Sequence, residues 1–193
     1  MSQTHADLLA LGPHAILLRG VNVGGHGKLP MKPFVVALAE AGLQAPASYI
    51  QSGNITCLSD LDPTGIAELV QGVMRDDFGL DRPVLVRTLP QIAALIRALP
   101  QAARDAPKSV MVYFHAGTEP HMPKVQPAPS ETVIPLRGAV VLHAPDGIGR
   151  SRCAAQLDKV LPGSVTARNA ATVAVLHSRL LALQAGLGEH GGI

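Results

Sequence analysis

Aromatic residues are scarce in this 193-residue chain, which has two tyrosines, three phenylalanines and no tryptophan. Because 47% of the residues are nevertheless hydrophobic, a core must be built mainly from Ala, Val, Leu and Ile side chains. Proteins that bind single-stranded RNA stack its bases on aromatic side chains, and only Tyr49 and Phe114 are placed to offer such a face. The composition predicts an aliphatic core and disfavours recognition by extensive base stacking.

Charged residues and cysteines are also few. The charged fraction of 16% lies below the usual share of about 25%, which argues against disorder and leaves room for an interaction face or an oligomer. The two cysteines, Cys57 and Cys153, lie far apart and outside any C-x-x-C spacing, so they indicate neither a zinc site nor a disulfide framework. The eight histidines do not follow metal-ligand spacing either, and we expect no metal site.

Long uncharged apolar runs are missing as well. No segment reaches the 18 or so uncharged apolar residues that cross a bilayer. The first apolar run is unlike a signal sequence, because Asp7 follows His5 and Gly12-Pro13 interrupts it. We therefore expect a cytoplasmic protein with no membrane association.

The hydrophobic pattern of the first half predicts the order strand, helix, strand, strand, helix, strand. The predicted strands are 15–21, 47–51, 55–58 and 83–87, and the predicted helices are 31–41 and 63–78. This order is that of the ferredoxin-like fold, in which two helices cover one face of an antiparallel sheet.

The second half partly repeats this order. The predicted elements are a helix over 91–99, strands over 109–115, 132–135 and 139–143, helices over 151–161 and 170–183, and a loose tail from 186. We predict an α+β protein of two ferredoxin-like α/β subdomains with antiparallel sheets and an extra C-terminal helix. The subdomains are expected over residues 1–104 and 105–193.

The ferredoxin-like order brings polar segments together. The first and second strands end, and the third begins, at the same edge of the sheet, so the loop 22–29 should lie beside the turn 51–54. The first helix also begins there, and its free amide groups attract negative charge. The candidate ligand-binding residues at this edge are Arg19, Asn22, Gly24, Gly25, Lys28, Gln51, Ser52 and Asn54.

This edge is suited to a phosphate or a carboxylate. Its glycines do not form the G-x-x-x-x-G-K-[ST] pattern, which excludes a Walker phosphate loop. Two helix entrances in the second half could complete the site, one with Arg150 and Ser151 and the other with Arg168 and Asn169. The alternative is local in each case: the glycines turn the loop, the asparagines bond loop backbone, and Ser151 and Asn169 cap their helices.

Four segments resemble the hallmarks of the family called domain of unknown function 1697. They are LLRGVNVGG (17–25), SYIQSGNI (48–55), DGIGRS (146–151) and TARN..TV..L (166–176). The resemblance implies a bacterial protein of about this length with a pair of α+β subdomains, and it brings no catalytic residue and no established biochemical role. Members usually carry an aromatic residue after the R-N pair, whereas this chain has Ala170.

The leading functional hypothesis is a cytosolic protein that binds a small anionic or phosphate-bearing ligand, with a nucleotide among the candidates. The alternative is a nucleic-acid-binding protein that uses the acid-free segments 8–39 and 159–188 as a positive stripe. The third hypothesis is an enzyme acting on a phosphorylated substrate, although the sequence identifies no activated nucleophile or base. It identifies no cofactor and no oligomeric state.

Overall fold

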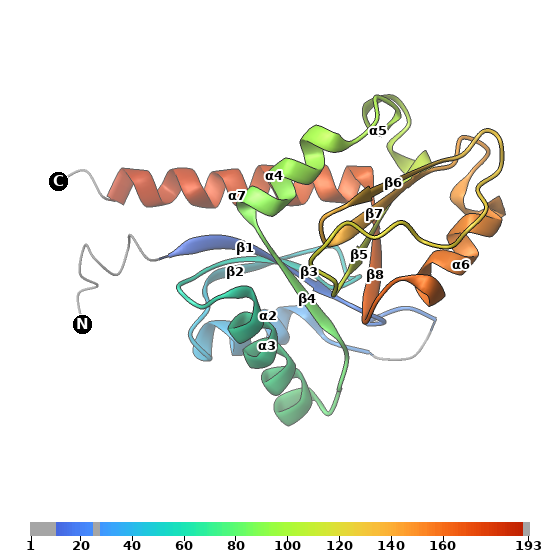
Figure 1. Ribbon diagram of the computed structural model, residues 1–193. Coiled ribbons are helices and arrows are strands. Elements are labelled where there is room, and N and C mark those ends of the chain that lie inside the picture. The colour runs from blue at the N-terminus through green and yellow to red at the C-terminus, as the bar shows by residue number, and fades with distance from the viewer. Residues whose placement is uncertain (1–10, 25–27, 191–193) are drawn as a thin grey trace. The chain divides into compact units, whose positions relative to one another are not determined.

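The computed structural model describes residues 11–24 and 28–190. The chain divides into two compact units (Figure 1). The first unit takes in the chain up to Ile92 and again from Leu176, and the second unit spans Ala93–Val175. The division into subdomains at residues 1–104 and 105–193 stays a prediction.

The first unit has the strand and helix order predicted for it. Its elements are β1 (Gly12–Leu18), α2 (Met31–Glu40), β2 (Gln44–Tyr49), β3 (Asn54–Ser59), α3 (Pro63–Phe78) and β4 (Val84–Thr88). The four strands form an antiparallel sheet in the order β2-β3-β1-β4, which is the ferredoxin-like order. Figure 1 shows α2 and α3 together on one face of this sheet.

The core of the first unit follows from helical spacing. In α3, Ile66, Val70 and Met74 recur every four residues and are fully buried, so one stripe of the helix faces the sheet. The helix begins where the Asp62 carboxylate accepts a hydrogen bond of 2.7 Å from the Gly65 amide. It ends at Gly79, whose φ of +64° is the left-handed conformation that terminates many helices.

The second unit repeats the sheet with fewer helices. Its elements are α5 (Ala102–Asp105), η1 (Pro107–Ser109), β5 (Val110–His115), β6 (Thr132–Leu136), β7 (Ala139–His143), η2 (Ile148–Arg150), α6 (Arg152–Val160) and β8 (Val165–Asn169). The sheet order is β6-β7-β5-β8. The remaining helices are α4 (Leu89–Ala98) and α7 (Ala170–His190), and the division between the units falls within their residue ranges.

The two sheets correspond strand by strand, with β1 to β4 matching β5 to β8. The correspondence extends to single hydrogen bonds at one sheet edge. In the first unit the Leu18 amide donates to the Gly53 carbonyl at 2.8 Å, and in the second the His115 amide donates to the Gly138 carbonyl at 3.1 Å. Both glycines have positive φ, +76° and +67°. Equivalent positions of the two units can therefore be compared residue by residue.

The predicted α+β class and the antiparallel sheets are confirmed. Two local predictions were wrong. Residues 165–169 form strand β8, although Thr166, Arg168 and Asn169 give the segment a polar pattern that favours a loop. Helix α7 continues to His190 through Gly186 and Gly188, because isolated glycines weaken a helix without ending it, so residues 186–190 are not a loose tail.

Helix α7 is long and apolar enough, by length and composition, to cross a membrane over Ala170–Gly188. Its Val173, Leu176 and Leu180 are fully buried at a spacing of three to four residues. Within the first unit its Arg179 makes a hydrogen bond to the end of β2. These residues form one buried stripe of α7, and 28% of the span Ala170–Gly188 is buried in total.

Candidate functional site

The predicted edge lies in the first unit, where β1 and β2 end and where β3 and β4 begin. The register pairs Leu18 with Val84 and Tyr49 with Asn54, so the four strand ends are level. We call this edge the rim and define it as residues 19–24, 28–30, 49–54 and 82–83. Gly25, which was also predicted to contribute, lies outside the described residues.

Asn22 joins the two segments that were predicted to meet at the rim. Its φ of +54° is left-handed. Its side-chain Nδ2 donates to the carbonyl oxygens of Leu29 and Gln51, and its Oδ1 accepts from the Leu29 amide, each at 2.9 Å. The predicted juxtaposition of loop and turn is thereby confirmed. Because both amide hydrogens are engaged, the Asn22 side chain holds the loop and has no donor left for a ligand.

The turn between β2 and β3 is held in one shape. Asn54 is fully buried, and its Nδ2 donates to the Tyr49 carbonyl at 3.3 Å and to the Ser52 hydroxyl at 3.2 Å. A Cβ atom on Gly53 would lie 2.6 Å from side-chain atoms of both Leu18 and Val21, so glycine is required there. Ile50 has a left-handed φ of +51°, which costs a β-branched residue about 1–2 kcal/mol.

Two arginines lie where β1 leaves the sheet and β4 enters it. The Arg19 amide donates to the Pro83 carbonyl at 3.1 Å, which places Arg82 one residue further along the same edge. The Nε of Arg82 is buried and has no hydrogen-bond partner among the described residues. A buried guanidinium nitrogen with no acceptor is costly. An anion that reached this nitrogen would supply the acceptor.

Arg82 was missed because the sequence prediction considered three strand ends of the sheet and not the fourth. The signal was present in the segment Arg82-Pro83 directly before the predicted fourth strand, which must begin at the same edge in this fold. The nearest acid in sequence is Asp81, whose Oδ1 accepts a hydrogen bond of 2.7 Å from the Gln71 side chain. Lys28 is exposed.

The second unit shows what the fold requires at this edge. The Ala116 amide donates to the Ser164 carbonyl at 3.2 Å, as the Arg19 amide donates to the Pro83 carbonyl. Ala116 is therefore equivalent to Arg19, and the residue before Ser164, Gly163, is equivalent to the residue before Pro83. This backbone hydrogen bond therefore forms in the second unit without an arginine at either position. The two guanidinium groups of the first unit are additions to a shared scaffold.

Helix α7 contributes a third arginine, from a position far along the chain. The Arg179 Nη1 donates to the Ser48 carbonyl at 3.1 Å, and its Cζ lies 5.0 Å from the centroid of the Tyr49 ring. A cation at this distance over a tyrosine face is attracted by the ring. The contact brings residue 179 to the end of β2 across 131 positions of sequence, and no local pattern predicts it.

The first turn of α2 is open at the rim. The N-cap residue Pro30 makes no side-chain capping hydrogen bond, and the first turn has no acidic residue. The helix begins two residues after Leu29, which Asn22 holds. The positive end of the helix dipole thus adds to the positive charge of the rim.

The predicted residues of the second unit make local bonds. The Ser151 hydroxyl accepts from the Ala154 amide and caps α6, and the Asn169 Oδ1 accepts from the Thr172 amide and caps α7, both at 2.9 Å. Arg150 is exposed.

Arg168 lies on β8 and is buried. Its Nη1 donates to the Thr166 hydroxyl and to the Ala167 carbonyl, both at 2.8 Å. Burial lowers the pKa of Arg168 to about 10. These bonds tie the guanidinium to its own strand, as the capping bonds tie Ser151 and Asn169 to their helices.

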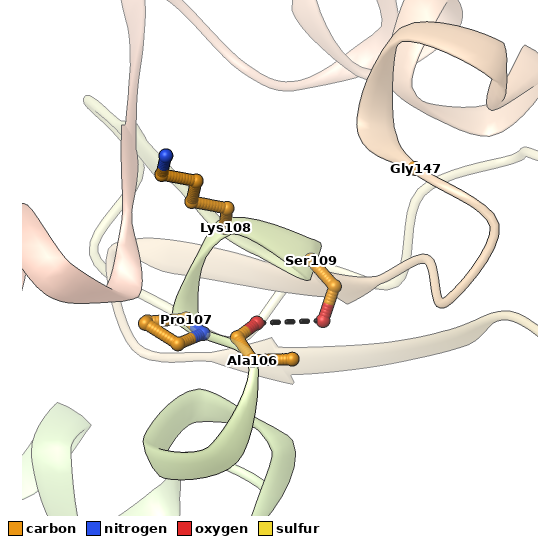
Figure 2. Close-up of a pocket in the computed structure, with 5 residues that line it drawn as sticks. All are labelled: Ala106, Pro107, Lys108, Ser109 and Gly147. Carbon is orange, nitrogen blue, oxygen red and sulfur yellow. Dashed lines mark hydrogen bonds between the residues drawn. The ribbon is translucent and has the colours of Figure 1, made fainter.

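A separate cavity lies within the second unit (Figure 2). It has a volume of about 420 Å³ and is lined by Ala106, Pro107, Lys108, Ser109 and Gly147. The Ser109 hydroxyl donates to the Ala106 carbonyl at 2.8 Å and is thereby satisfied. Lys108 is the one charged residue of this lining, so the cavity has few groups that could orient a polar ligand.

Comparison with known proteins bears on the family and the fold. A family model described as "Protein of unknown function (DUF1697)" matches residues 11–135, which is more than half of the chain. No curated protein matches the sequence significantly. The solved structure of the conserved bacterial protein SP0830 from Streptococcus pneumoniae is similar, with a TM-score of 0.69, 22% sequence identity, and coverage of 88% of this chain and 99% of that one. At this identity the likeness shows the fold alone.

Proposed function

This chain belongs to the DUF1697 family of proteins of unknown function, and we propose that it binds a phosphate-bearing anionic ligand at the rim of its first unit. The observation that carries the proposal is Arg82. Its Nε is buried and has no acceptor among residues 11–24 and 28–190, and the equivalent position of the second unit is Gly163. A guanidinium that the fold does not need, and whose donor is not satisfied, is suited to an anion.

The surroundings of Arg82 support an anionic ligand rather than a cation or a neutral one. The rim also carries Arg19 and Lys28, no acid occurs between residues 11 and 39, and the neighbouring Asp81 accepts a hydrogen bond from Gln71. The guanidinium group offers parallel donors that match two oxygens of a phosphate or a carboxylate. The open first turn of α2 attracts negative charge in the same region.

Binding is proposed rather than catalysis. The described rim contains no His, Cys, Asp or Glu side chain, which are the usual general bases and nucleophiles. The Ser52 hydroxyl accepts a hydrogen bond from the Asn54 side chain. The described rim residues carry cationic and hydrogen-bonding groups that are suited to binding an anion.

Isothermal titration calorimetry with ribose 5-phosphate at low ionic strength tests the proposal. The substitutions Arg19→Ala and Arg82→Ala are each expected to weaken binding about ten-fold or more, because a hydrogen bond to a charged group is worth about 1.5–3 kcal/mol. Arg75→Ala is the matched control, since Arg75 is exposed, pairs with Asp76 in α3, and carries the same charge.

Three results would contradict the proposal: no binding to the wild-type protein, unchanged binding after Arg82→Ala, or an equal loss after Arg75→Ala. The nucleic-acid alternative has a different signature. An oligonucleotide would bind more tightly than the sugar phosphate, and its affinity would fall linearly with salt on logarithmic axes, in proportion to the phosphates neutralised.

A further inference from the structure

We infer that the ligand of the rim carries an aromatic ring beside its phosphate, as a nucleotide does, and that Tyr49 receives this ring. The inference rests on the function proposed above and names the ligand class of the same site. It starts from the placement of the chain's few aromatic side chains, all of which lie in the described residues.

Tyr49 is the one Phe or Tyr ring of the chain that does not belong to a core. Phe34 and Phe78 pack edge to face in the first unit, with ring centroids 5.4 Å apart. Phe114 is 1% exposed and Tyr113 is 5% exposed, so the stacking face that the sequence suggested for Phe114 is not accessible. Tyr49 is partly exposed and is the last residue of β2, at the rim.

The Arg179 guanidinium lies over one face of the Tyr49 ring. The guanidinium carbon of Arg179 lies 5.0 Å from the ring centroid, and the same guanidinium donates to the carbonyl of Ser48. The backbone of Tyr49 is fixed as well, because its carbonyl accepts from the buried Asn54 side chain. A ring held in place on one face by a cation is prepared to stack on a second planar group, at little cost in conformational freedom.

The distance from Tyr49 to the arginines fits a nucleotide. In the order β2-β3-β1-β4, Tyr49 ends β2 and Arg19 follows β1, two strands away. Neighbouring strands are about 4.8 Å apart, so the two backbone positions are separated by about 10 Å. A ribose between base and phosphate, together with an extended arginine side chain, bridges that interval. Inorganic phosphate alone would leave Tyr49 without a role.

The second unit again shows what the fold alone requires. Its hairpin pairs Leu136 with Ala139, the positions that Tyr49 and Asn54 occupy in the first unit. The turn there has two residues, 137–138, whereas the turn after Tyr49 has four, 50–53. The aromatic ring, the buried amide and the longer turn with its strained Ile50 are thus features of the first unit only.

The test compares adenosine 5′-monophosphate with ribose 5-phosphate by calorimetry, in the wild type and in Tyr49→Leu and Tyr49→Phe. Leucine occupies the equivalent position 136, so the scaffold accepts it. We expect the nucleotide to bind about ten-fold more tightly than the sugar phosphate, as stacking on one aromatic side chain allows. Tyr49→Leu should bring the affinity for the nucleotide down to that for ribose 5-phosphate, and Tyr49→Phe should keep the preference.

Equal affinities for the two compounds, or a preference that survives Tyr49→Leu, would overturn the inference while leaving the anion site in place. If neither compound binds, the proposed function fails and this inference with it. A short single-stranded oligoadenylate is the third probe. Tighter binding than the mononucleotide, again lost in Tyr49→Leu, would support the stacking site and would identify a nucleic acid strand as the source of the ring.

Discussion

Replacing Asn22 tests whether the rim is built as the structure shows. Its side chain makes three hydrogen bonds of 2.9 Å, to Leu29 twice and to Gln51 once. At about 0.5–1.5 kcal/mol of net stabilisation for each bond, their loss costs about 2–4 kcal/mol. Asn22→Ala also places alanine at a φ of +54°, a left-handed conformation that costs alanine about 1 kcal/mol more than it costs asparagine.

Asn22→Gly separates the two contributions. Glycine adopts the left-handed conformation freely, so this variant loses the hydrogen bonds without the backbone cost. We expect Asn22→Ala to lower the free energy of unfolding by about 4 kcal/mol and Asn22→Gly by about 1 kcal/mol less than that. Far-ultraviolet circular dichroism in urea follows unfolding, since the chain has no tryptophan.

Two outcomes would refute this reasoning. A loss below about 0.5 kcal/mol in Asn22→Ala would mean that the side chain does not join the loop to the turn. A larger loss for Asn22→Gly than for Asn22→Ala would mean that the left-handed conformation is not adopted. Either result would separate residues 22–29 from 51–54 and remove the basis of the rim.

Two further predictions concern stability. In urea denaturation, Gly53→Ala should lower the free energy of unfolding by more than Gly24→Ala does. Both glycines have positive φ, but only at Gly53 would the new Cβ lie 2.6 Å from other side chains. Equal losses in the two variants would contradict the packing around Gly53. Burial raises the pKa of Tyr113 from 10.0 to about 12, so its contribution to stability is complete below pH 10 and is lost as pH rises from about 10 to about 12. An ultraviolet titration of phenolate should show this late ionisation and should lose it in Tyr113→Phe; a Tyr113 that ionises near pH 10 would contradict it.

The sequence predicted the fold well where periodicity was strong. Residues 63–78 read as a helix because Ile66, Val70 and Met74 recur at helical spacing, and α3 has those bounds. Strand β8 was missed because three of its five residues are polar, and its pairing with β5 depends on contacts that no local pattern records. Tertiary pairing overrides local preference there.

The site was predictable in outline only. Strand order alone was enough to bring residues 22–29 beside 51–54. The sequence did not show that the side chains of Asn22 and Asn54 would hydrogen-bond to loop backbone. An asparagine in a loop gives the same sequence pattern whether it holds a turn or binds a ligand. It also could not place Arg179 at Tyr49, because that contact joins two distant parts of the chain.

The central claim is that Arg82 offers an unsatisfied donor to an anion. A nitrogen-15 nuclear magnetic resonance titration of the arginine Nε–H groups with ribose 5-phosphate tests it directly, with Arg82→Lys assigning the signal. We predict a saturable shift of the Arg82 Nε–H resonance and a stationary Arg75 Nε–H resonance, since Arg75 Nε is already bonded to Asp76 at 2.9 Å. A stationary Arg82 signal, or equal movement of both, would contradict the account.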